Sequence, residues 1–475
     1  MSTPIHDSQT QPTVQEVDLN DVAWNEVVAT KLPANLEVQA RAHKAWSRKR
    51  GVSSVSDLLR ALLVYACCQY SFRELGMWAV LKGIGSLSER AWRKRLEQSG
   101  DWIAWLLTEL LGIHQRPAWL PAGAGRVRIV DATRWKTPAG TGDDVRLHQS
   151  YDLATGKMDQ VQLTDRHQAE SLSHFTLAEG DLMVTDAGYP VPSSVEVTQQ
   201  SKSFLLQRTT ASHLHIETEQ GQTIVLKGQV RGQRADSLKE IKGWVRLPKS
   251  GERTQVRLLC YRLPEEQAKK ARDRKAAKLR KKHGRKYNHE LVWWASWVLL
   301  VTTTDQAVWS GQDLIYLYRA RWQIELLFKR IKQCLRLHRL VLKDWKRVSC
   351  VLHLNLIAWW LQEQEAQWLR DLLTQVLSPT QGPIRELCEP EQEQGDEEES
   401  EESQWVISSW TLAHFCCEEV RTMLRGAWTR RRKQECEPAL RRYVLSRKRK
   451  RGHRETEQRV WLEAKCHQLA GRSAA

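Results

Sequence analysis

A stripe of charged and aromatic side chains near residue 320 has the residue types and spacing that point most directly to chemistry. At about 100° of rotation per residue, five of them fall on one narrow face of a helix: Tyr318, Arg321, Glu325, Lys329 and Lys332. The neighbouring face is apolar, which is typical of a helix with one side buried. The pattern predicts a helix from about Ser310 to Leu337, and a capping box of Ser310 and Asp313 supports its start.

The ordinary interpretation of this face is a solvated surface on which Glu325 pairs with Lys329 one turn later. The spacing is more specific than such a surface requires, because the four residue types follow one another as Y-(2)-R-(3)-E-(6)-K. With the run Trp322-Gln323-Ile324-Glu325 and with Phe328, the stretch resembles the insertion sequence 4 family of DDE transposases. The resemblance implies two partner aspartates upstream, each at the end of a strand.

Two aspartates match these positions. Asp131 follows the apolar strand expected at 126–130, and Asp186 follows the one expected at 182–185 and precedes Ala187-Gly188-Tyr189. Ala187 stands where the family often has a different residue. Taken alone, Asp131 is explained equally well as a strand-end aspartate that bonds its own turn. Together with Asp186 and Glu325, it is predicted to be catalytic.

Phosphodiester cleavage requires an activated water molecule, in-line geometry and relief of negative charge, and two divalent ions roughly 3.5 to 4 Å apart supply all three. Hard ions prefer carboxylate oxygens, so Asp131, Asp186 and Glu325 are predicted to hold two Mg²⁺ ions, with Mn²⁺ as a substitute. Competing acids in the same region are expected in turns or at helix starts on the surface: Asp143, Asp144, Asp152, Asp165, Glu170 and Asp181.

The resemblance also implies roles for the other polar residues of the stripe. Tyr318, Arg321 and Lys332 match positions that hold DNA phosphates near the cleavage site, and Lys329 is a further phosphate contact. The family reaction is cut-and-paste transposition through a hairpin intermediate, in which a flipped base stacks on an aromatic ring. Four tryptophans lie near enough in the sequence to be considered for stacking, although strand packing explains them more simply: Trp244, Trp293, Trp294 and Trp297.

The elements that must position these residues alternate between strands and helices. Strands are expected at 147–153, 158–164 and 204–207, with helices at 171–178 and 192–200. This order fits an α/β fold and the ribonuclease H-like mixed sheet that the resemblance implies. A β-rich insertion is expected at about 209–292, with strands at 223–226, 243–247 and 254–261 and a basic helix at 266–286. An apolar strand is expected at 293–303.

Helical regions flank this sheet. Residues 1–18 are expected to be disordered. Residues 19–120 are predicted to form a helical domain, and the resemblance implies that this domain binds DNA. Within that domain, 71–96 has the outline of a helix-turn-helix with exposed Arg90, Arg93, Lys94 and Arg95. A plain helical bundle is an equal alternative. The catalytic domain is predicted at 121–345, and a helical region with an acidic loop at 389–402 is predicted at 346–475.

Composition limits the class of protein. A net charge of +17 among 475 residues indicates a polyanionic partner, most simply nucleic acid. No apolar run reaches the length of a membrane span, and the N-terminus lacks a signal pattern. Ten cysteines without a metal-ligand spacing suggest a reduced, cytoplasmic protein. We expect a bacterial protein that associates with the nucleoid when bound to DNA.

These observations favour a DNA transposase that acts as a homodimer on paired terminal inverted repeats and on target DNA. Two alternatives remain at this stage. One is a metal-dependent nuclease of the same fold without strand transfer. The other is a transposon-derived DNA-binding protein that no longer cleaves, against which the three intact acids argue.

Overall fold

The computed structural model describes residues 19–47, 51–112, 125–136, 143–284, 287–334, 344–376, 405–407, 409–425, 445–447 and 460–466. The expectations for 1–18 and 389–402 lie outside these residues. The chain forms two compact units. One comprises residues 1–103, 351–399 and 407–446, and the other comprises 104–350, 400–406 and 447–475.

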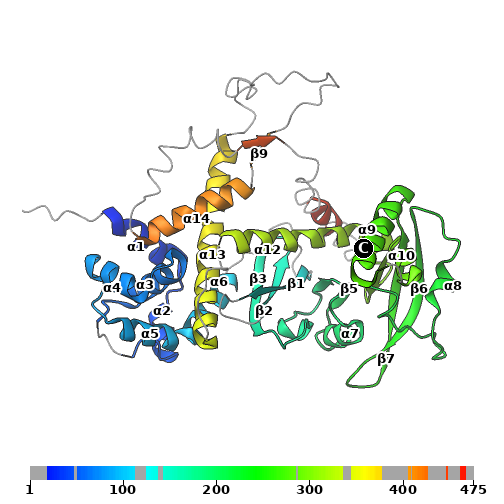
Figure 1. Cartoon of the computed structure of the whole chain (residues 1–475), viewed down its shortest axis with the longest axis horizontal. Helices are drawn as coiled ribbons and strands as arrows, with labels where there is room; N and C mark the ends of the chain where they lie inside the picture. Colours follow the sequence, from blue (N-terminus) through cyan, green and yellow to red (C-terminus); the bar gives the residue numbers. More distant parts are fainter. Residues whose placement is uncertain are drawn as a thin grey trace, which may run out of the picture. The chain divides into compact units, whose positions relative to one another are not determined.

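An eight-stranded mixed sheet organises the second unit, in the order β3-β2-β1-β4-β5-β8-β7-β6 (Figure 1). β1, β4 and β5 run parallel, and the remaining neighbours pair antiparallel. The strands are β1 (Val127–Lys136), β2 (Asp143–Asp152), β3 (Lys157–Asp165), β4 (Leu182–Thr185), β5 (Phe204–Thr209), β6 (Ser237–Arg246), β7 (Arg253–Arg262) and β8 (Trp297–Thr302).

One apolar core continues across this sheet. Val130 of β1, Met183 of β4 and Leu205 of β5 belong to the same buried cluster as Leu258 of β7 and Val301 of β8. Helix α7 (Val191–Gln200) packs against β5 and adds Val195 to the cluster. The expected insertion therefore extends the sheet through β7 and β6 and shares its core with the rest of the unit.

Local structure in the insertion differs from expectation at two places. The prediction of a strand at 223–226 is wrong, because Leu226 begins the short helix α8 (Leu226–Val230). The strand expected at 293–303 begins only at Trp297, because helix α10 (His289–Trp294), capped by Asn288, precedes it. The indoles of Trp293 and Trp294 pack around Trp297 with ring centroids 5.4 and 6.2 Å away. The basic helix is α9 (Glu265–His283).

Two further differences lie nearer the predicted site. The helix expected at 171–178 is reduced to the 3-10 turn η1 (Leu172–His174). The long helix expected from Ser310 is divided into α11 (Gly311–Tyr318), the 3-10 turn η2 (Arg319–Arg321) and α12 (Trp322–Cys334). The capping box of Ser310 and Asp313 is confirmed, and the predicted apolar face is buried at Leu317, Ile324, Leu327, Phe328 and Ile331.

The inserted strands hold the start of α11. Arg257 of β7 donates to the carbonyl oxygens of Thr304 and Trp309, each 3.1 Å away, and pairs with Glu240 of β6 at 2.8 Å. The helical residues 460–466 contact the same helix, because Lys465 Nζ lies 2.5 Å from Asp313 Oδ2. These contacts fix the helix that leads to Arg321 and Glu325.

The first unit is helical. Its N-terminal helices are α1 (Leu19–Lys31), α2 (Leu36–Ala42), α3 (Val55–Cys68), α4 (Phe72–Leu81), α5 (Glu89–Gln98) and the start of α6 (Gly100–Gly112). They share the unit with most of α13 (Trp345–Val376) and with α14 (Ser409–Arg425). Arg60 of α3 donates to the Leu424 carbonyl oxygen at 2.9 Å, and Arg421 of α14 donates to that of Cys67 at 3.1 Å. The N-terminal and C-terminal helices thus share one folded unit.

Within the region predicted to be helical at 346–475, Trp405–Ile407 form the short strand β9, and helix α14 begins at Ser409. A second short strand, β10, covers Leu445–Arg447. Within the part of the chain that the structure describes, no helix combines the length and the apolar character needed to cross a bilayer.

Candidate active site

The register of two parallel strands brings the two predicted aspartates together. Val127 of β1 pairs with Leu182 of β4, and Ile129 pairs with Val184, so that each partner lies 55 positions later (182 − 127 and 184 − 129). If this pairing is extended by two residues, Asp131 lies opposite Asp186. Neighbouring strands lie about 4.8 Å apart, so the two aspartates are adjacent. The expectation that β1 ends at Asp131 is wrong, because the strand continues to Lys136 by pairing with β2.

A buried ion network fixes this register at the opposite end of the two strands. Asp181, just before β4, accepts hydrogen bonds from the Arg126 backbone N–H at 3.1 Å and from its guanidinium at 2.8 Å. Arg128 of β1 pairs with Asp159 of β3 at 2.8 Å and with Asp181 at 3.3 Å. A side chain at Gly125 would overlap the Gly180 carbonyl oxygen, so a glycine permits this close approach of the two backbones.

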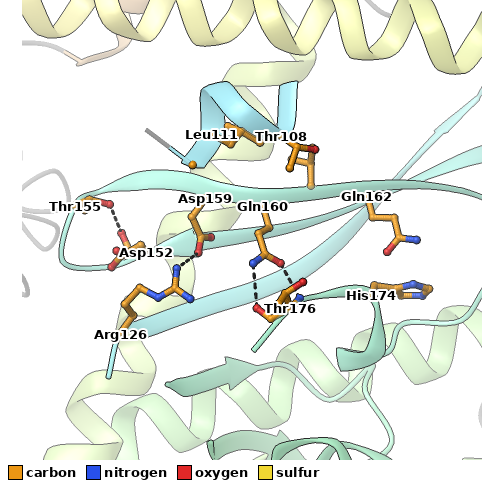
Figure 2. Close-up of a pocket in the computed structure, with 12 residues that line it drawn as sticks. Thr108, Leu111, Arg126, Asp152, Thr155, Asp159, Gln160, Gln162, His174 and Thr176 are labelled. Carbon is orange, nitrogen blue, oxygen red and sulfur yellow. Dashed lines mark hydrogen bonds and ion pairs between the residues drawn. The ribbon is translucent and has the colours of Figure 1, made fainter. Parts of the chain in front are cut away.

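This network borders a polar pocket of about 490 Å³, shown in Figure 2. Arg126, Asp152 and Asp159 line it together with Gln160 and His174, and one of the dashed lines in Figure 2 joins Arg126 to Asp159. The surface positions expected for Asp152 and Asp181 are wrong, because both side chains are buried in or beside the network. Burial raises the pKa of Asp152 to about 6. None of the predicted catalytic residues lines this pocket.

Asp131 and Asp186 occupy a partly desolvated position. Each carboxylate accepts a backbone hydrogen bond of 2.7 Å, Asp131 from Ala132 and Asp186 from Gly188. Burial raises the pKa of Asp131 to about 7, and the neighbouring Asp186 raises it further, whereas the Ala132 N–H and Arg321 lower it. A carboxyl group in this environment gains from a cation placed next to it.

Arg321 links the third acid to the first. Its Nη1 lies 3.4 Å from Asp131 Oδ2, and its Nη2 donates to Glu325 Oε1. Helix α12 packs against β1 (Figure 1). Glu325 lies in the first turn of this helix, and Arg321 joins it to Asp131. The pairing of Glu325 with Lys329 does not form. The Lys329 side chain is exposed, and no hydrogen bond or ion pair joins its ammonium group to another described residue.

The donor set suits a hard divalent cation in its chemistry, because all three acids offer carboxylate oxygens. Within the described ranges, however, no three acidic, histidine or cysteine side chains converge tightly enough to hold a metal ion. Arg321 supplies the positive charge between Asp131 and Glu325. Binding of a cation by these two acids requires the guanidinium to move aside.

The remaining residues of the stripe differ in exposure. The Tyr318 hydroxyl is buried, and no described residue hydrogen-bonds to it. Burial raises its pKa to about 12 against the opposing effects of Arg321 and Arg208, so the phenol stays protonated and is available as a donor. Lys332 is half-buried. Arg208 of β5 carried no sequence signal, and only the fold brings it near Tyr318.

The tryptophans that the sequence offered for base stacking are mostly packed. Trp297 is buried in the core, and Trp293 and Trp294 pack against the same core cluster. Trp244 lies half-buried on β6. By contrast, the Trp322 side chain, at the first position of α12, is 52% exposed and follows Arg321 directly. It is the better candidate for a stacking contact, and its place in the Trp322-Gln323-Ile324-Glu325 run was the available signal.

The predicted N-terminal DNA contacts lie on α5. Arg90, Arg93 and Lys94 are exposed. Arg95 is not on the exposed side, because it donates to the Ala45 carbonyl oxygen at 3.2 Å and covers the Trp46 ring. The connection from Lys82 to Ser88 is longer than the roughly three- to four-residue turn of a helix-turn-helix. An antiparallel β-bridge between Gly85 and Val52 holds this connection in place.

Comparison with known proteins agrees with this geometry. Residues 122–361 match the family model of the transposase DDE domain. The chain is 30% identical over 342 residues to the putative transposase InsL for insertion sequence element IS186A of Escherichia coli (strain K12), with 70% of this chain and 91% of that protein covered.

Two other relatives carry similar descriptions. The transposase for insertion sequence element IS421 of Escherichia coli is 30% identical over 343 residues, with the same coverage of 70% and 91%. The transposase for insertion sequence element IS231D of Bacillus thuringiensis subsp. finitimus is 23% identical over 277 residues, which is 52% of this chain and 58% of that protein. The matched family region contains Asp131, Asp186 and Glu325.

Proposed function

The chain belongs to the transposase DDE domain family, and we propose that it excises and integrates an insertion sequence of the insertion sequence 4 type by metal-dependent cleavage and strand transfer. The observation that carries this proposal is the parallel register of β1 and β4, which puts Asp131 and Asp186 side by side when extended by two residues, with Glu325 joined to Asp131 through Arg321. The strand order β3-β2-β1-β4-β5 supports a ribonuclease H-like core for the reaction.

In this proposal Asp131, Asp186 and Glu325 hold two Mg²⁺ ions, with Mn²⁺ as a substitute. Bound divalent ions would supply an activated nucleophile and offset charge at phosphorus. The protein orients these carboxylates through the parallel register and the backbone N–H groups of Ala132 and Gly188. Displaced from the acids, Arg321 can pair with a DNA phosphate in a bidentate manner.

Other residues hold the DNA. The neutral phenol of Tyr318 donates to a phosphate oxygen, and Lys329 and Lys332 add positive charge along α12. Trp322, which is exposed next to Arg321, provides a stacking surface for a base. Arg90, Arg93 and Lys94 on α5 contact the phosphates of the terminal inverted repeats. A homodimer would bring two such ends and the target DNA together.

The decisive experiment is cleavage and strand transfer on double-stranded DNA that carries the element's own ends. Asp131→Asn, Asp186→Asn and Glu325→Gln are each expected to bind the ends and to leave them uncut. Mg²⁺-dependent nicking retained by any of them would refute the site. A pre-cleaved end tests strand transfer separately, since a plain nuclease gives no joined product, and a wild-type chain that binds without cutting would favour the DNA-binding alternative.

A further inference from the structure

A fourth carboxylate lies beside the aspartate pair, at Glu170 between β3 and η1. The turn after β4 allows Glu170 and Asp186 to come this close. A Cβ atom at Gly188 would overlap Glu170 Oε2 and would lie 3.0 Å from Asp186 Oδ1. The two carboxylates therefore share the space next to one glycine, and any side chain at position 188 would have to displace Glu170. The sequence predicts a surface position for Glu170, and only the fold brings it to Asp186.

This pair of carboxylates has no close counterion in the described part of the chain. Neither Glu170 nor Asp186 has an ion-pair partner within 4 Å among the described residues, and Arg321 reaches only Asp131 and Glu325. Burial and the charge of Asp186 raise the pKa of Glu170, which Arg146 and Arg134 lower from farther away. Two adjacent carboxylates that lack a cation repel each other.

A buried hydroxyl faces the same acids. The Tyr189 side chain is 3% exposed, and none of the described residues hydrogen-bonds to its hydroxyl. Burial raises the pKa of Tyr189 well above its ordinary value, and the charges of Asp131, Glu170 and Asp186 raise it further. A phenol that stays protonated and lacks a partner in such a place is available to donate to a bound group or to the water around it.

The strand next to β1 adds a second group without a partner. Gln149 of β2 pairs directly with Asp131 and therefore lies on the same face of the sheet. Its side chain is fully buried, and no hydrogen bond joins either amide atom to another described residue. Buried amides are seldom left without a hydrogen bond, because the loss of their hydration is then not compensated. The Tyr189 hydroxyl and the Gln149 amide are thus two polar groups without a partner beside the same acids.

We propose that Glu170 is a fourth acidic residue of the active site, and that it supplies an oxygen, directly or through a bound water molecule, to the divalent cation held beside Asp186. This inference rests on the proposed function. Mg²⁺ keeps several water ligands, which suits an outer carboxylate and the unpartnered hydroxyl of Tyr189. The role is toward the cation, and Glu170 is not required to contact DNA.

Mn²⁺ binding to the full chain without DNA tests this role independently of activity. Free Mn²⁺ is counted by electron paramagnetic resonance for the wild type, Glu170→Gln and Glu179→Gln. Glu179 is a matched control from the same connection, since its side chain is 74% exposed and 3.8 Å from Lys202. Glu170→Gln is expected to weaken Mn²⁺ binding about tenfold or more, whereas Glu179→Gln should bind as the wild type does.

Thermal unfolding separates a cation ligand from a structural residue. In EDTA, Glu170→Gln should raise the melting temperature because it removes repulsion with Asp186, and it should reduce the further rise that Mn²⁺ causes in the wild type. A lower melting temperature in EDTA would indicate a structural glutamate and overturn the inference. Glu170→Asp keeps the charge and is expected to restore part of the Mn²⁺ affinity.

The same measurements distinguish this inference from the function on which it rests. If Asp186→Asn loses Mn²⁺ binding while Glu170→Gln binds within twofold of the wild type, the fourth acid is refuted and the site of Asp131 and Asp186 stands. If Asp131→Asn and Asp186→Asn both bind Mn²⁺ as the wild type does, the proposed cation site itself is wrong.

Discussion

Asp131 lies in an environment unlike that of an ordinary surface carboxylate. Its pKa of about 7 in the folded protein lies above the value of about 3.9 expected for an unfolded chain. The folded state therefore binds the proton more tightly, and the free energy of unfolding falls as the pH rises between these two values. Above the folded pKa, the ionised group destabilises the metal-free protein.

Asp131→Asn should consequently raise the melting temperature of the metal-free protein at pH 8. The difference from the wild type should shrink on acidification and be small near pH 4, where Asp131 is protonated in the folded state and about half protonated in the unfolded chain. Melting curves in EDTA from pH 4 to pH 8 measure this. A difference that stays constant with pH would mean that Asp131 does not titrate in this range.

Arg321 occupies two of the three acids when no cation is bound. Because its guanidinium pairs with both Asp131 and Glu325, it competes with a cation for the same oxygens. Arg321→Gln should tighten Mn²⁺ binding in the absence of DNA severalfold while reducing cleavage. Arg319, exposed in the same 3-10 turn, provides the control variant Arg319→Gln. Weaker Mn²⁺ binding by Arg321→Gln would show that the arginine organises the acids instead.

At the scale of single elements, the parallel pairing of β1 with β4 determines the site, and the buried network behind it holds that pairing. Asp181→Ala leaves Arg126 and Arg128 without one of their partners. Breaking a buried pair in this way costs about 3–5 kcal/mol. We expect a loss of that order in the free energy of unfolding, measured with urea, whereas Glu179→Ala should change it little. A loss below about 1 kcal/mol would show that the register does not depend on this network.

The elements were predictable from sequence where one local signal sufficed. The capping box at Ser310 and the apolar run of β4 lead directly to the observed start of α11 and to the buried strand before Asp186. The 3-10 turn at Arg319–Arg321 was not predictable, because 3-10 and α turns place apolar residues at similar spacing. Nor was the continuation of β1 past Asp131, which depends on pairing with β2.

The candidate site shows the same division. Asp131, Asp186 and Glu325 were proposed from motifs that are local in the chain, and the fold brings the first two to one level of the sheet. Glu170, Tyr189 and Gln149 could not be assigned, since their surroundings depend on contacts between separate segments. Arg95 resembled its exposed neighbours in sequence, and only the packing against Trp46 distinguishes it.

At the scale of the whole molecule, a net charge of +17 must act through particular surfaces. Each cation that neutralises a DNA phosphate releases counterions, so the logarithm of the binding constant falls with the logarithm of salt concentration by about 0.9 per contact. On α5, Arg90, Arg93 and Lys94 are exposed at the end of the chain predicted to bind DNA. By comparison, Arg41 on α2 is also exposed but already pairs with Glu37 at 2.7 Å.

Combined replacement of these three α5 residues by glutamine should reduce the salt slope of DNA binding by about one per cation, while Arg41→Gln should leave the slope nearly unchanged. Fluorescence anisotropy with labelled DNA at several salt concentrations measures both slopes. The loss should be equal for the element's ends and for unrelated DNA if α5 contacts only phosphates. A loss of affinity confined to the element's ends would instead assign base recognition to α5. An unchanged slope would show that the main DNA contact lies on another surface such as α9, where lysine and arginine are concentrated.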